Sequence, residues 1–430
     1  MTGRLSIHDG PRKHSMLIPR VVEGCAFGLY ISLVYKMDKL GILCLLILCL
    51  CSFSLKIFRR FLFSRLAIVS ILYVAMATVS AFLVSFGEGA YRTVQFLILV
   101  ISTAVLVVYF CNIPEWRRAL FIRRFAILTA IIFAHMVLYH LATGHLTTWK
   151  YLYDTKSVLS ISIIVIFFYE DLITRRFGRI AFYIAIGVLF ALLLISGERK
   201  AYILFAAVYL LSREALVIKL GIIVAGSMAI AAFAAFAPSD SYVARQIDTL
   251  ITPKREMQIG EFYGIENIGD QSDIIRDFVN RMAREQFKEN PILGLGATGY
   301  QNWSKANFGL STDSRGLAMN VHGEINRVPA EGGIIGITVA ISYYILLVVS
   351  VFRDFTYRST QQNSSAARLP LYVLSFLTIY ASVEALDTFM LELVLLFGFT
   401  MAARNASAAK SNHFELGSSL WRRNRAIASR

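Results

Sequence analysis

Long apolar runs follow one another along almost the whole chain, and they limit what it can fold into. A helix needs about 20 apolar residues to cross the hydrocarbon core of a membrane. We expect about twelve such spans, at 17–35, 40–55, 66–86, 93–111, 125–142, 157–169, 180–196, 201–211, 220–237, 328–352, 369–383 and 388–403. The sixth, eighth, eleventh and twelfth runs are short, so tilted or re-entrant segments could change the count by one or two. The pattern predicts an all-α polytopic membrane protein. With 57% hydrophobic and 17% charged residues, the composition is too apolar for a soluble globular protein.

The positive charges predict how these spans are oriented, because Lys and Arg collect in cytoplasmic loops. With the N-terminus inside, 26 of the 43 basic residues fall in cytoplasmic segments and seven in the short outside loops. The other ten lie in one long loop, together with twelve acidic residues. Both termini are therefore expected in the cytoplasm and the long loop outside. This topology accounts for most of the net charge of +15. Because the chain has no RNA-binding signature or zinc-finger spacing, we expect no nucleic-acid partner.

Four regions follow from this topology. They are the first nine spans (1–237), the large outside loop (238–327), the last three spans (328–403) and a basic cytoplasmic tail (404–430). The loop is the only long polar segment in the chain. Loops of this length are uncommon unless they serve recognition or chemistry, so we look for the functional residues there and at the membrane edge beneath it.

One helix is expected inside the loop, at 273–289. Ile275, Phe278 and Met282 recur there at spacings of three and four, which gives an apolar stripe suited to lying on the membrane or on the helical bundle. Further along the loop, Tyr300 and Trp303 could stack on sugar rings or anchor the loop at the membrane interface.

Charged residues stand out in two places on the outside. Arg199 and Lys200 lie in a tight hairpin between the seventh and eighth spans. Charges at the membrane edge between apolar runs are costly, which indicates a functional site unless the two side chains only snorkel to the surface. In the loop, Arg276 lies on the expected helix, and His322 lies close to the start of the tenth span, where the helix dipole favours an anion.

The loop also carries two ordered motifs. Arg276 begins the pattern R-x14-P-I-L-G-L-G, and His322 begins the pattern H-x8-E-x-G-I-I-G. Together with a long outside loop after the ninth of twelve spans, this order resembles the O-antigen ligase and O-antigen polymerase family. The architecture covers the whole chain, whereas the motifs are confined to about 150 residues.

The resemblance implies a fold like that of the GT-C glycosyltransferases, in a bacterial inner membrane, with the loop in the periplasm. In that family two arginines bind the diphosphate of an undecaprenyl-linked glycan, and a histidine serves in glycosyl transfer. The matching positions here are Arg199, Arg276 and His322. Lys200 could add a phosphate contact. Glu331, Gly294 and Gly296 are supporting positions within the motifs, although a Gly-rich turn is more often only a turn. This chain departs from the family pattern at Glu198, at Lys200 and at Gly323, where the family often has Asn.

The chemistry of these residues agrees with that implication. Arginine stays charged and offers paired donors to phosphate oxygens, so it can stabilise a diphosphate leaving group. A neutral histidine can accept the proton of an acceptor hydroxyl. The chain shows no Asp-x-Asp pair and no His/Cys cluster, so we expect metal-independent transfer without a cofactor. Three carboxylates in the last hairpin could position the acceptor, orient Arg199 or face a water-filled cavity: Glu384, Asp387 and Glu392.

The expected partners are the undecaprenyl-diphosphate-linked glycan, an acceptor glycan and the lipid bilayer. The acceptor is either lipid A core, for a ligase, or a growing repeat-unit chain, for a polymerase, and the motifs do not separate the two. An alternative is a secondary transporter or polysaccharide exporter without catalytic activity, because twelve spans with both ends inside are common in transporters.

Overall fold

The computed structural model describes most of the helical part of the chain. The described residues are 17–52, 71–72, 74–75, 78–79, 86–143, 155–196, 199–236, 272–296, 299–308, 321–361, 365–383, 395–396 and 398–400. Every regular element within these residues is a helix, as the apolar pattern predicts.

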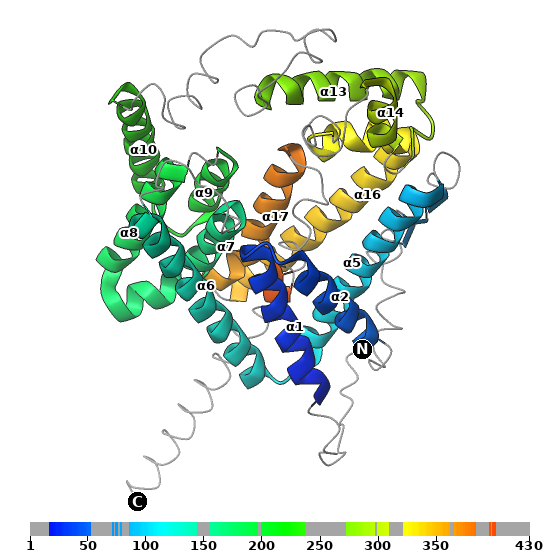
Figure 1. Cartoon of the computed structure of the whole chain (residues 1–430). Helices are drawn as coiled ribbons and strands as arrows, with labels where there is room; N and C mark the ends of the chain where they lie inside the picture. Colours follow the sequence, from blue (N-terminus) through cyan, green and yellow to red (C-terminus); the bar gives the residue numbers. More distant parts are fainter. Residues whose placement is uncertain are drawn as a thin grey trace, which may run out of the picture.

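The helices follow the predicted spans closely (Figure 1). In chain order they are α1 (Leu17–Val34), α2 (Asp38–Ser52), α5 (Phe86–Asn112), α6 (Glu115–Thr143), α7 (Thr155–Phe168), α8 (Glu170–Ser196), α9 (Arg199–Leu211), α10 (Leu216–Phe236), α13 (Ser272–Glu289), α14 (Gly299–Phe308), α16 (Glu324–Gln361) and α17 (Ser365–Val383). All except α13 and α14 coincide with a predicted span. The predicted spans 66–86 and 388–403 lie mainly outside the described residues. Helix α13 confirms the helix predicted inside the loop, whereas α14 was not predicted.

Only some of these helices are long and apolar enough to cross a membrane. Among the described residues, four helical stretches are long and apolar enough to cross a membrane: Thr93–Asn112, Glu115–Thr143, Glu170–Leu193 and Glu324–Arg353. Four apolar helices are shorter: Lys156–Phe168, Lys200–Leu211, Leu216–Ala229 and Ala367–Ser382. The structure therefore has the character of an all-α membrane protein with four candidate spans.

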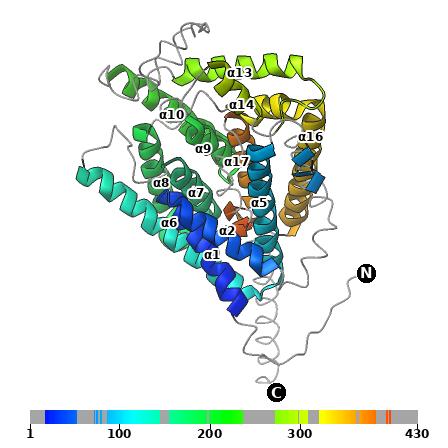
Figure 2. The ribbon, with the colours of Figure 1, turned by 45° about the vertical axis from the view of Figure 1, so that its right-hand side comes forward.

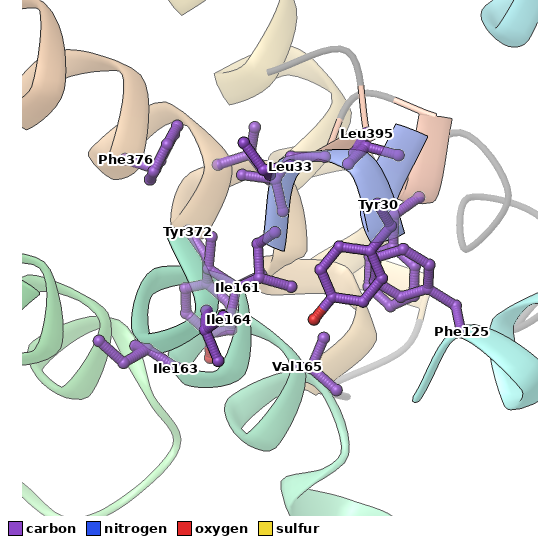
Figure 3. Close-up of a cluster of buried hydrophobic side chains, with 14 of the residues drawn as sticks. Tyr30, Leu33, Phe125, Ile161, Ile163, Ile164, Val165, Tyr372, Phe376 and Leu395 are labelled. Atoms are coloured by element: carbon purple, nitrogen blue, oxygen red, sulfur yellow. The ribbon is translucent and has the colours of Figure 1, made fainter. Parts of the chain in front are cut away.

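The core of the molecule surrounds α7. This helix packs against α1, α6, α8, α9 and α17, and it is apolar around most of its circumference, which is typical of a helix enclosed on all sides. Phe167 on α7 is fully buried and makes edge contacts with four aromatic rings, those of Phe182, Phe205, Tyr209 and Tyr372. Figure 3 shows side chains of α1, α6, α7 and α17 gathering there, with Tyr30 stacked on Phe125 at a ring separation of 4.9 Å. We call this cluster the bundle core.

Two cations from different parts of the chain meet at the C-terminal end of α9. Lys219 Nζ donates to the carbonyl oxygens of Leu210 and Ser212, both at 2.7 Å, and Arg368 Nη1 donates to those of Leu211 and Ser212. The last carbonyls of a helix lack partners within the helix, and cations there also interact well with the helix dipole. Lys219 and Arg368 come from two segments that the charge pattern predicts to lie on the same side of the membrane.

Helices α13 and α14 lie together at one end of the bundle, next to the start of α16, in both Figure 1 and Figure 2. Helix α13 packs mainly against α16, and α14 also contacts it. Helix α16 begins at Glu324, four residues before the predicted boundary between the loop and the last spans. The helical end of the loop thus leads directly into the tenth predicted span, with a break at Gly333.

Candidate functional site

His322 is held against α13 by a side chain one helical turn from Arg276. The backbone N–H of His322 donates to Asn280 Oδ1 at 3.2 Å. Arg276 and Asn280 are four residues apart on α13, so they lie on the same side of the helix. Both side chains are half-buried. The fold thus places His322 beside the side of α13 that carries Arg276.

The backbone after His322 is fixed by the start of α16. The Gly323 carbonyl accepts the N–H groups of Asn326 and Arg327 at 3.1 and 3.0 Å, and Asn326 Nδ2 donates to the His322 carbonyl at 3.4 Å. Gly323 has a φ of 84°, which Gly adopts freely and which Asn tolerates better than most residues. Gly323 therefore adopts this conformation without strain.

An ion pair that the sequence analysis did not single out lies in the first turn of α16. Arg327 Nη2 is 2.8 Å from Glu324 Oε1, and their side chains are only 12% and 15% exposed. Oppositely charged residues three apart on a helix are neighbours, so the E-x-x-R spacing was the signal available in the sequence. This pair holds a second guanidinium one turn from Gly323.

The two motifs of the loop meet where α16 is interrupted. At Gly333 the backbone is not helical, with φ 59° and ψ −156°. In an uninterrupted helix the carbonyls of Ala330 and Glu331 would accept the N–H groups of Ile334 and Ile335. The motif at 291–296 takes their place: Leu295 N donates to Ala330 O at 2.8 Å, Gly296 N to Glu331 O at 2.9 Å, Ile334 N to Pro291 O at 2.8 Å and Ile335 N to Ile292 O at 3.4 Å. These four backbone groups of α16 thereby regain hydrogen-bond partners.

Glycine is needed on both sides of this contact. A Cβ on Gly333 would lie 2.3 Å from the carbonyl oxygen of Ile292, and a Cβ on Gly294 would lie 2.5 Å from the carbonyl carbon of Glu331. Both residues also have positive φ, at 59° and 65°. We call residues 291–296 and 330–335 the glycine clasp. Because 291 follows α13 after only one residue, the clasp fixes α13 to the start of α16.

The clasp also assigns roles to three supporting positions. The Gly294 N–H donates to Asn290 O at 3.0 Å and the Gly296 N–H donates to Glu331 O at 2.9 Å, so both amides are already bonded within the protein. A phosphate contact through these amides would require those bonds to break. The turn interpretation of the Gly-rich motif therefore fits the structure, and Glu331 takes part in the clasp through its carbonyl.

The apolar stripe of α13 faces the protein. Phe278 and Val279 are each 1% exposed, and the fully buried Ala283 follows them one turn later. Met282 is half-buried, and the side chain of Ile275 lies outside the described residues. Of the two predicted positions, on the membrane or on the bundle, the structure has the second.

Tyr300 closes the same small core from α14. It is 1% exposed, and its hydroxyl donates to Val279 O at 3.1 Å. Burial raises the pKa of the Tyr300 phenol. A ring enclosed in this way is not accessible to a sugar, so the predicted stacking role does not fit Tyr300. The half-buried Trp303 packs on Tyr300 at a ring separation of 5.5 Å.

The structure does not join the first predicted arginine to this site. Helix α9 begins at Arg199, and it packs against α7, α10 and α17, whereas α13 packs mainly against α16. Lys200 is half-buried, and the side chain of Arg199 lies outside the described residues. The meeting of Arg199 and Lys200 with His322 therefore stays a prediction. The carboxylates Glu384, Asp387 and Glu392 also lie outside the described residues.

No group of three or more His, Cys, Asp or Glu side chains is placed to hold a metal ion in the described ranges. A comparison of the sequence with known protein families and with curated proteins finds no match. The resemblance to the O-antigen ligase and polymerase family is thus carried by the two motifs and the order of the predicted spans.

Proposed function

We propose that the chain is a bacterial inner-membrane glycosyltransferase that moves a glycan from undecaprenyl diphosphate to an acceptor sugar hydroxyl in the periplasm. The observation that supports this most is the placement of His322, which hydrogen-bonds to α13 one turn from Arg276. The reaction requires a base at the acceptor hydroxyl and a cation at the diphosphate within one site. Their sequence motifs are also the two that form the glycine clasp.

In the proposed reaction the acceptor hydroxyl attacks the anomeric carbon of the donor sugar. A new glycosidic C–O bond forms, and the bond from that carbon to the diphosphate oxygen breaks with its electron pair on the leaving group. The His322 imidazole accepts the hydroxyl proton, which contributes typically about 10²–10⁴-fold to such a step. The proton then passes to water or to the released undecaprenyl diphosphate.

Arg276 has the electrostatic role, with Arg199 and Lys200 as further phosphate-binding residues. Negative charge grows on the diphosphate as the bond breaks, and fixed cations aimed at that charge stabilise the transition state more than the ground state. Guanidinium groups do this without changing protonation, because they stay charged at any physiological pH. The arginines therefore supply the charge neutralisation that other glycosyltransferases obtain from a metal ion.

The proposal includes a GT-C-like architecture with twelve spans, cytoplasmic termini and a periplasmic loop. The four long apolar helices and the four shorter ones support a polytopic arrangement. The binding of the α9 carbonyls by both Lys219 and Arg368 supports placing their two segments on the same side of the membrane.

The acceptor is tested by deleting the gene and separating the surface polysaccharide on a gel. A single repeat unit left on the lipid A core identifies a polymerase. Long chains left on the carrier lipid identify a ligase. An unchanged polysaccharide contradicts both assignments, and glycan flux through proteoliposomes without a new glycosidic bond identifies an exporter instead.

The catalytic role is tested with purified His322→Ala. We expect turnover of the lipid-linked glycan to fall by about 10²–10⁴-fold, because the base is lost, while binding of undecaprenyl diphosphate is retained. His135→Ala is the matched control, since His135 is exposed on α6 and hydrogen-bonds to Tyr35 there. Unchanged turnover in His322→Ala excludes the general-base role.

The binding role is tested with Arg276→Ala, for which we expect undecaprenyl diphosphate to bind roughly 10- to 100-fold more weakly, as for a lost charge-assisted hydrogen bond. The affinity of Arg276→Lys should lie between those of the native chain and Arg276→Ala, because lysine keeps the charge and loses the paired donors. The control is Arg284→Ala, an exposed arginine on the same helix. Equal binding by the Arg276 and Arg284 variants contradicts the assignment.

A further inference from the structure

We infer that Asn280 is a positioning residue that sets where His322 lies relative to Arg276. The inference rests on the proposed function and adds to it a residue that touches neither the donor nor the acceptor. It concerns how the chain holds the histidine in place.

The backbone of His322 is bonded at both of its polar groups by asparagine side chains. Asn280 Oδ1 accepts its N–H at 3.2 Å and Asn326 Nδ2 donates to its carbonyl at 3.4 Å. These asparagines come from α13 and α16, so His322 lies between the two helices. The next residue is Gly323, and glycine restricts the backbone less than any other residue. The two amide groups therefore help to fix the backbone of His322, from which the imidazole extends.

Asn280 is the more important of the two because it shares a helix with Arg276. Four residues of α-helix span about 6 Å along the axis. Helix α13 is held rigidly by its buried apolar face and by the glycine clasp at its end. The hydrogen bond from the His322 N–H to Asn280 thus fixes the histidine backbone relative to the helix that carries Arg276.

The chemistry of the donor makes the distance between His322 and Arg276 important. In an undecaprenyl-diphosphate glycan the reacting anomeric carbon is bonded directly to a phosphate oxygen. The base must therefore lie at a fixed distance from the cation that binds the diphosphate. A displacement of about 1 Å from the productive geometry can lower the rate by about 100-fold.

The experiment compares Asn280→Ala and Asn280→Gln with the native chain. Turnover is measured with lipid-linked glycan extracted from cells that lack the gene, and binding with undecaprenyl diphosphate in detergent. We expect kcat to fall about 10- to 100-fold in Asn280→Ala, because the anchor is lost, with an unchanged Kd for undecaprenyl diphosphate. Asn280→Gln keeps the amide but moves it by one methylene, so kcat should fall about 10-fold in a folded protein. Asn280→Asp keeps the accepting oxygen and should recover most of the kcat.

A double-variant cycle separates positioning from a structural role. In the His322→Ala background there is no imidazole to position, so Asn280→Ala should lower the residual turnover no further. Asn307→Ala on α14 is the matched control, because Asn307 is exposed and donates to its own helix at Trp303 O.

Each failure has a distinct result. Native kcat in Asn280→Ala or Asn280→Gln, together with a strong loss in His322→Ala, overturns the positioning role and leaves the proposed function intact. Native kcat in His322→Ala overturns the catalytic proposal itself. An equal loss from Asn280→Ala in both backgrounds, or a weaker binding of undecaprenyl diphosphate, assigns Asn280 a structural or binding role and overturns the inference.

Discussion

The bundle core and the glycine clasp both hold helices of the structure together, and they are built in opposite ways. Around α7 the contacts are made by large side chains, such as Phe167 among four aromatic rings. In the clasp they are made by the backbones themselves, brought together at Gly294 and Gly333. The bundle core depends on large side chains that fill space, whereas the clasp depends on glycines that have no side chain and let the two backbones approach. Mutations of opposite kinds should therefore damage them.

The proposed topology explains the difference. Between helices inside a membrane there is little hydrophobic driving force, because lipid tails are as apolar as leucine, so close packing of side chains has to hold them together. At the end of the bundle the backbone leaves the helical pattern, and its freed N–H and C=O groups must find partners. The clasp supplies them from a second segment of the chain.

The largest expected effect is on the bundle core. Phe167→Ala removes a fully buried ring, and a Phe→Ala change in a core typically lowers the free energy of unfolding by about 3–5 kcal/mol. The measurement is thermal unfolding of the purified protein in detergent. Phe236→Ala is the control, because that side chain is 88% exposed. If the two variants unfold alike, side-chain volume does not hold the bundle together.

A smaller and more local effect is expected in the clasp. Gly333→Ala forces a Cβ toward the Ile292 carbonyl at a φ of 59°, and such a backbone conformation alone costs about 1–3 kcal/mol. Hydrogen exchange should become faster in α13 and at 330–335 while α7 stays protected. Gly187→Ala adds a methyl group where no atom lies within 4 Å and should leave the exchange unchanged. Equal exchange rates in both variants would contradict the dependence of the clasp on close backbone contact at Gly333.

The smallest effect is expected at Tyr300. Tyr300→Phe loses the hydrogen bond to Val279 O, worth about 1 kcal/mol. Because burial raises the pKa of the folded phenol, its contribution is complete below the unfolded pKa of about 10 and is lost as the pH rises through the higher folded value. Unfolding is followed by Trp303 fluorescence, with the other tryptophans replaced by Phe. The native chain should lose stability above about pH 10 relative to Tyr300→Phe, and parallel pH profiles would contradict this.

The helices were predictable because their signals are local. A run of apolar residues such as 157–169 identifies α7 whatever surrounds it, and the stripe of Phe278 and Met282 identifies α13. Helix α14 was missed because it is short and carries no strong apolar period. Its polar sequence around Tyr300 and Trp303 gave no sign of a helix.

The site was predictable only in part. His322 and Arg276 are recognisable from their motifs, but the hydrogen bond between His322 and Asn280 joins residues 42 positions apart and leaves no periodic signal. The same holds for the clasp. The glycines at 294 and 333 are visible in the sequence, whereas the exchange of backbone partners between them depends on the fold.

The break in α16 has a practical consequence for anyone who wishes to produce the loop by itself. A fragment that ends at 327, where the polar sequence ends, would contain residues 291–296 without the carbonyls of Ala330 and Glu331 or the amides of Ile334 and Ile335. Its four backbone groups would face solvent, and α13 would lose the helix that covers its apolar face. A soluble version would need to extend through Ile335 and replace the exposed isoleucines at its end, or be fused there to a helical scaffold.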